Sequence, residues 1–212
     1  MRSFLLLLIL IGVVLFYISF PKPTPPTLPK AYPEASSGLS GFAQPQPTPM
    51  PLPPTPLPAT PLPPAFLDMD AVALNNAGLE TLAKGDLTMA MTYFQYAIER
   101  KHDFYEPYNN LAGVLYEQGR IEEAILCWEE ALKLESDSPD ANAGLGTALA
   151  AKGEFWLGWS YYQRALQLDA DYADATKLVQ KRLWGPRALT DSEPLRQYAS
   201  QVLNVRSEAT AQ

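Results

Sequence analysis

The hydrophobic and small residues between positions 71 and 172 recur at a fixed spacing of 34 residues. Inside each unit the apolar positions follow the three-to-four-residue spacing of an amphipathic helix, and a glycine interrupts them once. This pattern predicts helical pairs in an all-α array of three units, residues 71–104, 105–138 and 139–172. The aligned columns are Ala90, Ala124 and Gly158; Ala97, Ala131 and Ala165; Gly78, Ala112 and Gly146; Gly85, Gly119 and Gly153; and Phe94, Trp128 and Tyr162.

Each column has a physical role in such a helical pair. The small residues let two antiparallel helices approach closely, and the aromatic column fills the space toward the next unit. Gly85, Gly119 and Gly153 follow the first helix of each unit, where a left-handed residue costs least as glycine. Ser138 and Pro139 supply an N-cap and a first-turn proline for the third unit.

The period and the residue types in these columns resemble the tetratricopeptide repeat. Asn142 stands where a large aromatic residue is usual, so the third unit is the loosest match. The resemblance implies a helix-turn-helix solenoid whose first helices line a concave groove for a peptide or helix of another protein. The middle unit matches best, through Tyr108, Leu111, Ala112, Leu115, Gly119, Ala124, Trp128 and Ala131. The implied groove residues include Asn75, Asn76, Leu79, Asn109, Asn110, Gly113, Tyr116 and Thr147.

The groove residues indicate what such a partner could be. Asn76 and Asn110 are equivalent, and an amide both donates and accepts, so the pair could hold a peptide backbone. Gly113, Gly144 and other small residues are expected to leave the third-repeat groove wide and shallow, which suits a helix. A clamp for a C-terminal carboxylate, as in related co-chaperones, is not expected, because Asp140 would repel the ligand.

The chain beyond the repeats predicts two further elements. Residues 173–184 are expected to cap the last unit and to end at Gly185 and Pro186, which completes a domain over residues 68–186. Residues 191–194 signal the start of an amphipathic helix within residues 187–212. That helix either packs back on the cap or binds a partner or the protein's own groove. The apolar stripes are Ala175, Leu178, Val179 and Leu183 in the cap, and Leu195, Tyr198, Ala199, Val202 and Leu203 in the helix.

The N-terminal region, residues 1–20, predicts a membrane segment. Residues 4–20 carry no charge, and as a helix they nearly span a hydrocarbon core of about 30 Å. A cleaved signal peptide is the alternative, but the bulky residues before Pro21 do not suit cleavage. We expect one uncleaved transmembrane anchor, with Arg2 inside and the repeats on the extracytoplasmic side of the membrane.

Residues 21–67 form a proline-rich linker. Proline lacks the amide donor and fixes φ, so neither a helix nor a sheet is expected there, and polyproline II is the expected state. The simplest role is a disordered spacer that holds the domain off the membrane. A ligand for a module that recognises PxxP is the alternative, but residues 31–67 offer no adjacent basic residue.

Composition removes several classes of function. Acidic residues outnumber basic ones by 23 to 16, for a net charge of −7, which argues against nucleic acid as a partner. One cysteine, Cys127, and one histidine argue against disulfide frameworks and metal centres. Acidic pairs such as Glu122 and Glu123 read as solvated helix faces rather than catalytic pairs. We therefore expect no catalytic site, no metal, no cofactor and no small-molecule substrate.

Together these features favour a membrane-tethered scaffold or adaptor that binds a protein segment in its groove. The layout resembles bacterial assembly factors for membrane or envelope complexes, such as photosystem assembly factors with one membrane helix and three repeats. The alternative is a self-associating structural spacer without a peptide ligand.

Overall fold

The computed structural model describes residues 64–66 and 68–209, with the side chains of residues 65 and 203–209 left aside. The predicted anchor and residues 21–63 of the linker lie outside the described residues. Within the part that is described, no helix combines the length and the apolar character needed to cross a bilayer.

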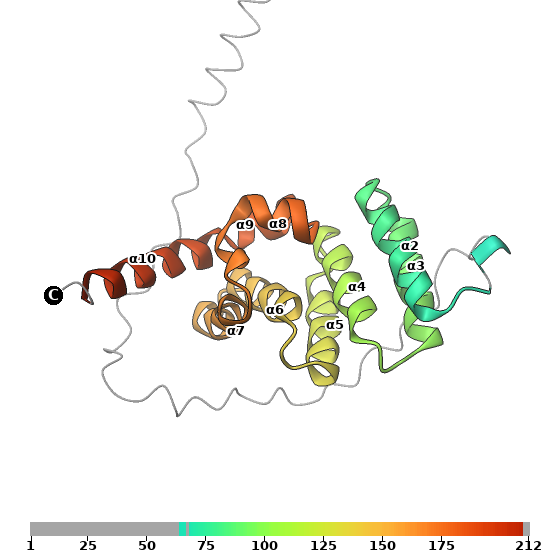
Figure 1. The fold of residues 1–212 in the computed structure, drawn as a ribbon, viewed down its shortest axis with the longest axis horizontal. Coiled ribbons are helices and arrows are strands. Elements are labelled where there is room, and N and C mark those ends of the chain that lie inside the picture. Colours follow the sequence, from blue (N-terminus) through green and yellow to red (C-terminus); the bar gives the residue numbers. More distant parts are fainter. Residues whose placement is uncertain (1–63, 67, 210–212) are drawn as a thin grey trace, which may run out of the picture. The chain divides into compact units, whose positions relative to one another are not determined.

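Three helical pairs follow one another along the chain (Figure 1). The first pair is α2 (Ala71–Ala83) and α3 (Leu87–Arg100), and the second is α4 (Tyr105–Glu117) and α5 (Ile121–Leu134). The third pair is α6 (Pro139–Ala151) and α7 (Phe155–Leu168). Residues 68–209 contain no strand, so the predicted all-α repeat array is confirmed.

The turns of the array form as the sequence predicts. Gly85, Gly119 and Gly153 have φ of +84°, +80° and +92°, in the left-handed region that favours glycine. Ser138 Oγ accepts a hydrogen bond from the Ala141 amide at 3.3 Å and caps α6, as expected.

The small residues sit where backbones meet. A methyl group added at Gly146 would lie 2.6 Å from the carbonyl oxygen of Gly158 and 2.8 Å from the amide nitrogen of Tyr162. The aromatic column is buried as well, with Phe94 and Tyr162 fully enclosed. Each pair is therefore closely packed, and the aromatic side chains join one pair to the next.

Asn142 explains why the third unit lacks its usual aromatic residue. Its side chain is 1% exposed and donates to the backbone carbonyls of Ser136, at 3.1 Å, and Ser138, at 2.8 Å. The amide thus fastens the turn that precedes α6 from inside the fold.

The array begins earlier than the sequence predicts. The predicted linker reaches residue 67, but Pro64–Phe66 forms a short 3₁₀ turn. Phe66 packs edge-to-face on Tyr93 of α3, with 5.3 Å between ring centroids. This contact with a buried side chain draws the last linker residues onto the array.

The described C-terminal region has one more α-helix than predicted, and a short 3₁₀ turn before them. It runs through η2 (Ala170–Ala173), α8 (Ala175–Arg182), α9 (Pro186–Asp191) and α10 (Glu193–Ala209). Gly185 and Pro186 end the predicted cap, but Pro186 also occupies the first turn of α9. The sequence does not predict α9 because a proline can follow the end of one helix and can also occupy the first turn of the next.

The cap itself is only partly as expected. Leu178 is buried, but Val179 and Leu183 are 47% and 39% exposed. Leu183 takes a left-handed conformation with φ 55°, which breaks the predicted stripe. The start of α10 contributes the remaining cover, because Leu195 is fully buried beside Tyr162 and Tyr172. Of the two alternatives for this helix, packing on the end of the array is what the structure shows for its first turns.

Candidate functional site

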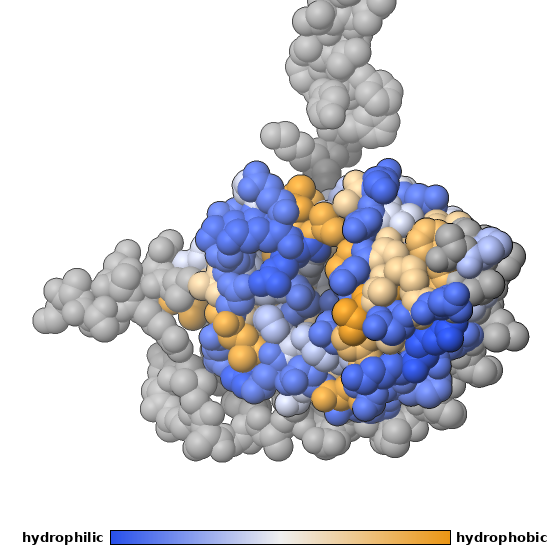
Figure 2. Space-filling model, turned by 45° about the vertical axis from the view of Figure 1, so that its right-hand side comes forward, coloured by the Kyte–Doolittle hydropathy of each residue, from blue (hydrophilic) through white to orange (hydrophobic). Residues whose placement is uncertain are grey.

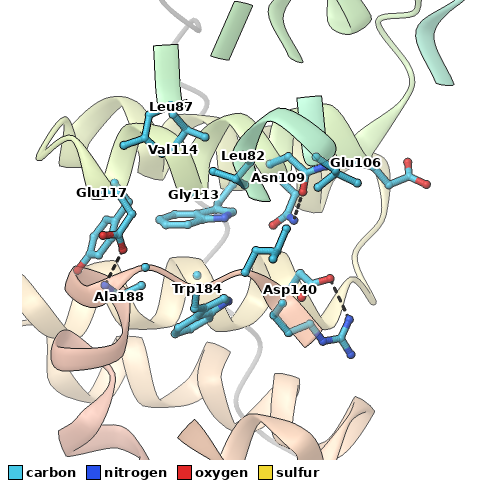
Figure 3. A pocket seen from close by; sticks show the side chains of 18 of the residues that line it. Leu82, Leu87, Glu106, Asn109, Gly113, Val114, Glu117, Asp140, Trp184 and Ala188 are labelled. Carbon is cyan, nitrogen blue, oxygen red and sulfur yellow. Dashed lines mark hydrogen bonds and ion pairs between the residues drawn. The ribbon is translucent and has the colours of Figure 1, made fainter. Parts of the chain in front are cut away.

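A pocket of about 800 Å³ lies between the first helices of the units and the C-terminal region. The α2 and α4 residues Leu82, Gly113 and Val114 line one side, and Trp184 and Ala188 line the other (Figure 3). On the face shown in Figure 2, hydrophobic residues lie between regions of hydrophilic ones. We call this pocket the open half of the groove, because inner-helix side chains remain accessible there.

Residues 183–191, which we call the closing segment, form one wall of this pocket, and through α9 they cover the neighbouring part of α4 and α6. The Glu117 carboxylate accepts the backbone amides of Arg187, at 3.1 Å, and Ala188, at 2.9 Å. Gly185 makes this approach possible, since a methyl group there would lie 2.3 Å from the Glu117 side chain. One carboxylate at the end of α4 thus satisfies two amides in the first turn of α9.

A second polar contact holds the far end of the closing segment. The Tyr116 hydroxyl donates to Asp191 Oδ2 at 2.7 Å. Burial, with Asp191 adding to it, raises the pKa of Tyr116 well above its usual value. The phenol therefore stays a donor throughout the physiological pH range.

Asp140, at the start of α6, joins the third repeat to the C-terminal region. It accepts a hydrogen bond from the Tyr172 hydroxyl and pairs with Arg182 at 3.3 Å. Arg182 also pairs with Asp169. The carboxylate that was expected to repel a ligand is instead neutralised by an arginine of the same chain.

Asparagine side chains cross the floor of the open half. Asn110 Nδ2 donates to Asn75 Oδ1 at 2.9 Å, and Asn109 Nδ2 lies 3.4 Å from Asn110 Oδ1. Asn75 is only 5% exposed, so its side-chain amide contacts the protein more than it faces the pocket. Of the predicted pair Asn76 and Asn110, only Asn110 lines the pocket, because Asn76 is exposed outside it and Asn75 is the residue that meets Asn110.

The other predicted groove residues are brought together. Thr147 is buried, and its hydroxyl bonds to the Ala143 carbonyl at 2.8 Å, so it offers a contact surface rather than a free hydroxyl. Val179 and Leu183 were missed as pocket residues, because their spacing assigned them to the cap. The predicted residues that line the pocket are Asn75, Leu79, Asn109, Asn110, Gly113, Tyr116 and Thr147.

The third-repeat groove is not the wide, shallow surface predicted from its small residues. A methyl group at Gly144 would lie 2.3 Å from the Trp128 ring, which already occupies that space. Beyond it, α9 lies along α4 and α6. Small residues here admit an aromatic ring and a helix of the same chain.

The family model for the TPR (tetratricopeptide) repeat matches residues 112–153. This segment covers the end of α4, all of α5 and α6, and Gly153. The matched segment is a tetratricopeptide repeat, and the three helical pairs form an array of the same kind. Repeats of this kind generally mediate protein–protein interaction and scaffolding, and their helical fold is typically not enzymatic.

Cys127, Arg120 and Glu123 are ionisable groups of this tetratricopeptide array that lie outside the groove, and each is buried or paired with another residue of the chain. Burial raises the pKa of the Cys127 thiol to about 12, so the reactive thiolate is scarce at neutral pH. Arg120, hydrogen-bonded to Glu123 at 2.5 Å, lowers the pKa of that carboxyl. Across residues 64–66 and 68–209, no cluster of His, Cys, Asp and Glu side chains is suited to a metal ion.

Proposed function

We propose that this chain is a scaffold or adaptor that binds a segment of a partner protein in the open half of its groove. The supporting observation is the pocket of about 800 Å³, which has apolar residues on both sides. Leu79 and Leu82 of the inner helices line it together with the exposed side chains of Val179 and Leu183. Exposed large apolar side chains gathered in one pocket are typical of interaction sites.

The tether belongs to the same proposal. Residues 4–20 would anchor the chain in a membrane, and the proline-rich residues up to 63 would space the array from it. A scaffold held there would collect subunits of a membrane or envelope complex on the extracytoplasmic side. The support for this placement is the uncharged N-terminal segment with Arg2 before it.

Site-specific photo-crosslinking in cells tests the groove. Gly113 is a suitable position, because an added Cβ there meets nothing within 4 Å. The control is Glu99 on α3, which is exposed and outside the pocket. We expect adducts with another protein from position 113 and none from position 99. Equal adducts from both positions would contradict the proposal, and adducts of twice the chain's own mass would favour the self-associating spacer.

Protease treatment of intact spheroplasts tests the tether, with a tag placed at Gln212. The proposal expects the tagged array to be degraded while the membrane is unbroken. Protection until the membrane is opened would place the array on the other side. Release of the array into the soluble fraction would contradict the anchor itself.

A further inference from the structure

Two carboxylates occupy the same position in successive repeats of the groove wall. Glu106 lies in the first turn of α4 and Asp140 in the first turn of α6, and they are 34 residues apart. Both line the pocket. Because the repeats superimpose position by position along a solenoid, these two groups present the same charge to whatever lies in each half of the groove.

The C-terminal region shows what the Asp140 position binds. Arg182 pairs with Asp140 and is followed at once by Leu183 and Trp184, which both line the pocket. Figure 3 shows Trp184 there. Trp184 packs on Tyr172 with 6.2 Å between ring centroids. The occupant of this position is thus a basic residue followed by two large apolar side chains.

The Glu106 position has no such occupant. Glu106 is partly exposed, and its carboxylate makes no hydrogen bond or ion pair with any other described residue. Its own wall offers no neutralising charge either. The inner helices α2, α4 and α6 contain no lysine, arginine or histidine, and their acidic residues are Glu80, Glu106, Glu117 and Asp140.

The local potential around this position is negative. Tyr105 lines the pocket beside Glu106. Burial is the main cause that raises the pKa of Tyr105, and the negative charges of Glu106, Asp140 and Glu135 raise it further. The lysine and the arginine that line the pocket are already engaged, since Lys181 pairs with Asp171 at 2.7 Å and Arg182 pairs with Asp140. An incoming base would therefore meet an unpaired carboxylate in a half-buried setting, where ion pairs contribute more than on an open surface.

We propose that the partner segment is basic and apolar, and that it places a lysine or arginine against Glu106. Its apolar side chains lie between Leu79 and Leu82 on one side and Val179 and Leu183 on the other. The segment repeats, one unit nearer the N-terminus, the contact that Arg182 makes with Asp140. It binds beside the closing segment, which serves as a wall of the site. This inference rests on the proposed function and adds the chemistry of the partner.

A random dodecapeptide library selected on the full chain in detergent tests the inference. We expect the recovered peptides to be enriched in lysine and arginine next to large apolar residues. Selection on Glu106→Lys is expected to lose this enrichment and to favour acidic residues instead. Neutral or acidic peptides recovered on the natural chain would overturn the inference.

Affinity measurements with one recovered peptide then locate the contact. Glu106→Gln is expected to weaken binding about tenfold, the scale of one charge-assisted contact. Glu80→Gln is the matched control, because Glu80 is an exposed carboxylate on α2 outside the pocket, and it is expected to change nothing. Equal losses in the two variants would overturn the inference. A loss with Asp140→Asn but not with Glu106→Gln would mean that the peptide displaces the closing segment, which also overturns it.

Gly113→Leu separates this inference from the proposed function, because a larger side chain there enters open space in the pocket. If Gly113→Leu abolishes peptide binding while Glu106→Gln has no effect, the groove binds partners but the basic chemistry is wrong. If Gly113→Leu has no effect on any recovered peptide, or no peptide is recovered, both the inference and the groove proposal are contradicted.

Discussion

The two halves of the groove share one wall and differ in what covers it. Both carboxylates line the pocket of about 800 Å³, but Asp140 pairs with Arg182 and α9 lies along this part of the wall, whereas the Glu106 side chain has no such partner among the described residues. The closing segment lies outside the repeats, so the difference between the halves comes from the chain that follows them. A repeat wall with equivalent positions thus becomes a site with one structural half and one open half.

Gly146 and Gly113 give the largest contrast, because one lies against backbone and the other borders open space. Gly146→Ala would place a methyl group 2.6 Å from the Gly158 carbonyl oxygen. We expect it to lower the free energy of unfolding by about 3 kcal/mol, as overpacked sites do. Gly113→Ala has room and should raise that free energy by up to about 1 kcal/mol, from helix propensity. Urea unfolding of both variants checks the pair, and equal destabilisation would contradict the difference between the two sites.

Removal of the Glu117 carboxylate should open the closed half. Glu117→Ala leaves the amides of Arg187 and Ala188 without their acceptor. The expected loss is about 1.5 kcal/mol of stability, because both amides can partly turn to water. Hydrogen exchange of these two amides should accelerate, while α2 and α3 keep their protection. Unchanged exchange at both amides would mean that the carboxylate does not hold the closing segment.

A smaller effect is expected from the Tyr116 hydroxyl. Tyr116→Phe keeps the ring and removes only the hydrogen bond to Asp191 at 2.7 Å. The free energy of unfolding should fall by about 1 kcal/mol, the usual net contribution of such a bond. A thermal melt compared with Tyr198→Phe provides the control, since Tyr198 contributes ring contacts to Phe155, Trp156 and Trp159. The larger loss should come from Tyr116.

The smallest expected difference appears at alkaline pH. Burial raises the pKa of Tyr116, Tyr162 and Tyr172 above the usual 10.0, and all three lie near the closed half. Above pH 10 the unfolded chain loses protons that the folded chain keeps, so stability is complete below pH 10 and falls as the pH rises. Tyrosinate absorbance should therefore develop together with unfolding. Full ionisation of these tyrosines before loss of helical circular dichroism would contradict their burial.

The sequence predicts the array better than the site. The 34-residue spacing places α2–α7, the turn glycines and the buried aromatic column, because each depends on local chemistry that every repeat shares. The closing segment has no repeat to reveal it. Gly185 and Pro186 fit the end of one helix and the start of another equally well, and the left-handed Leu183 alters which side chains face the pocket.

The asparagine residues show the same limit at finer scale. Neighbouring positions on a helix differ in direction by about 100°, so Asn75 enters the wall and Asn76 faces outward. The resemblance to the family limits the candidate groove residues to these two neighbouring positions, but it does not show which of the two faces the groove. Contacts between repeats, such as Asn110 with Asn75 at 2.9 Å, decide it in three dimensions.

Hydrogen–deuterium exchange of the full chain, with and without a peptide recovered on it, tests the central claim that the open half receives the partner. We predict slower exchange in α2 and α4 on binding, with exchange in residues 183–191 no faster than before. Faster exchange in residues 183–191, or protection confined to α6 and α7, would show that the partner replaces the closing segment or binds elsewhere, and would contradict the account.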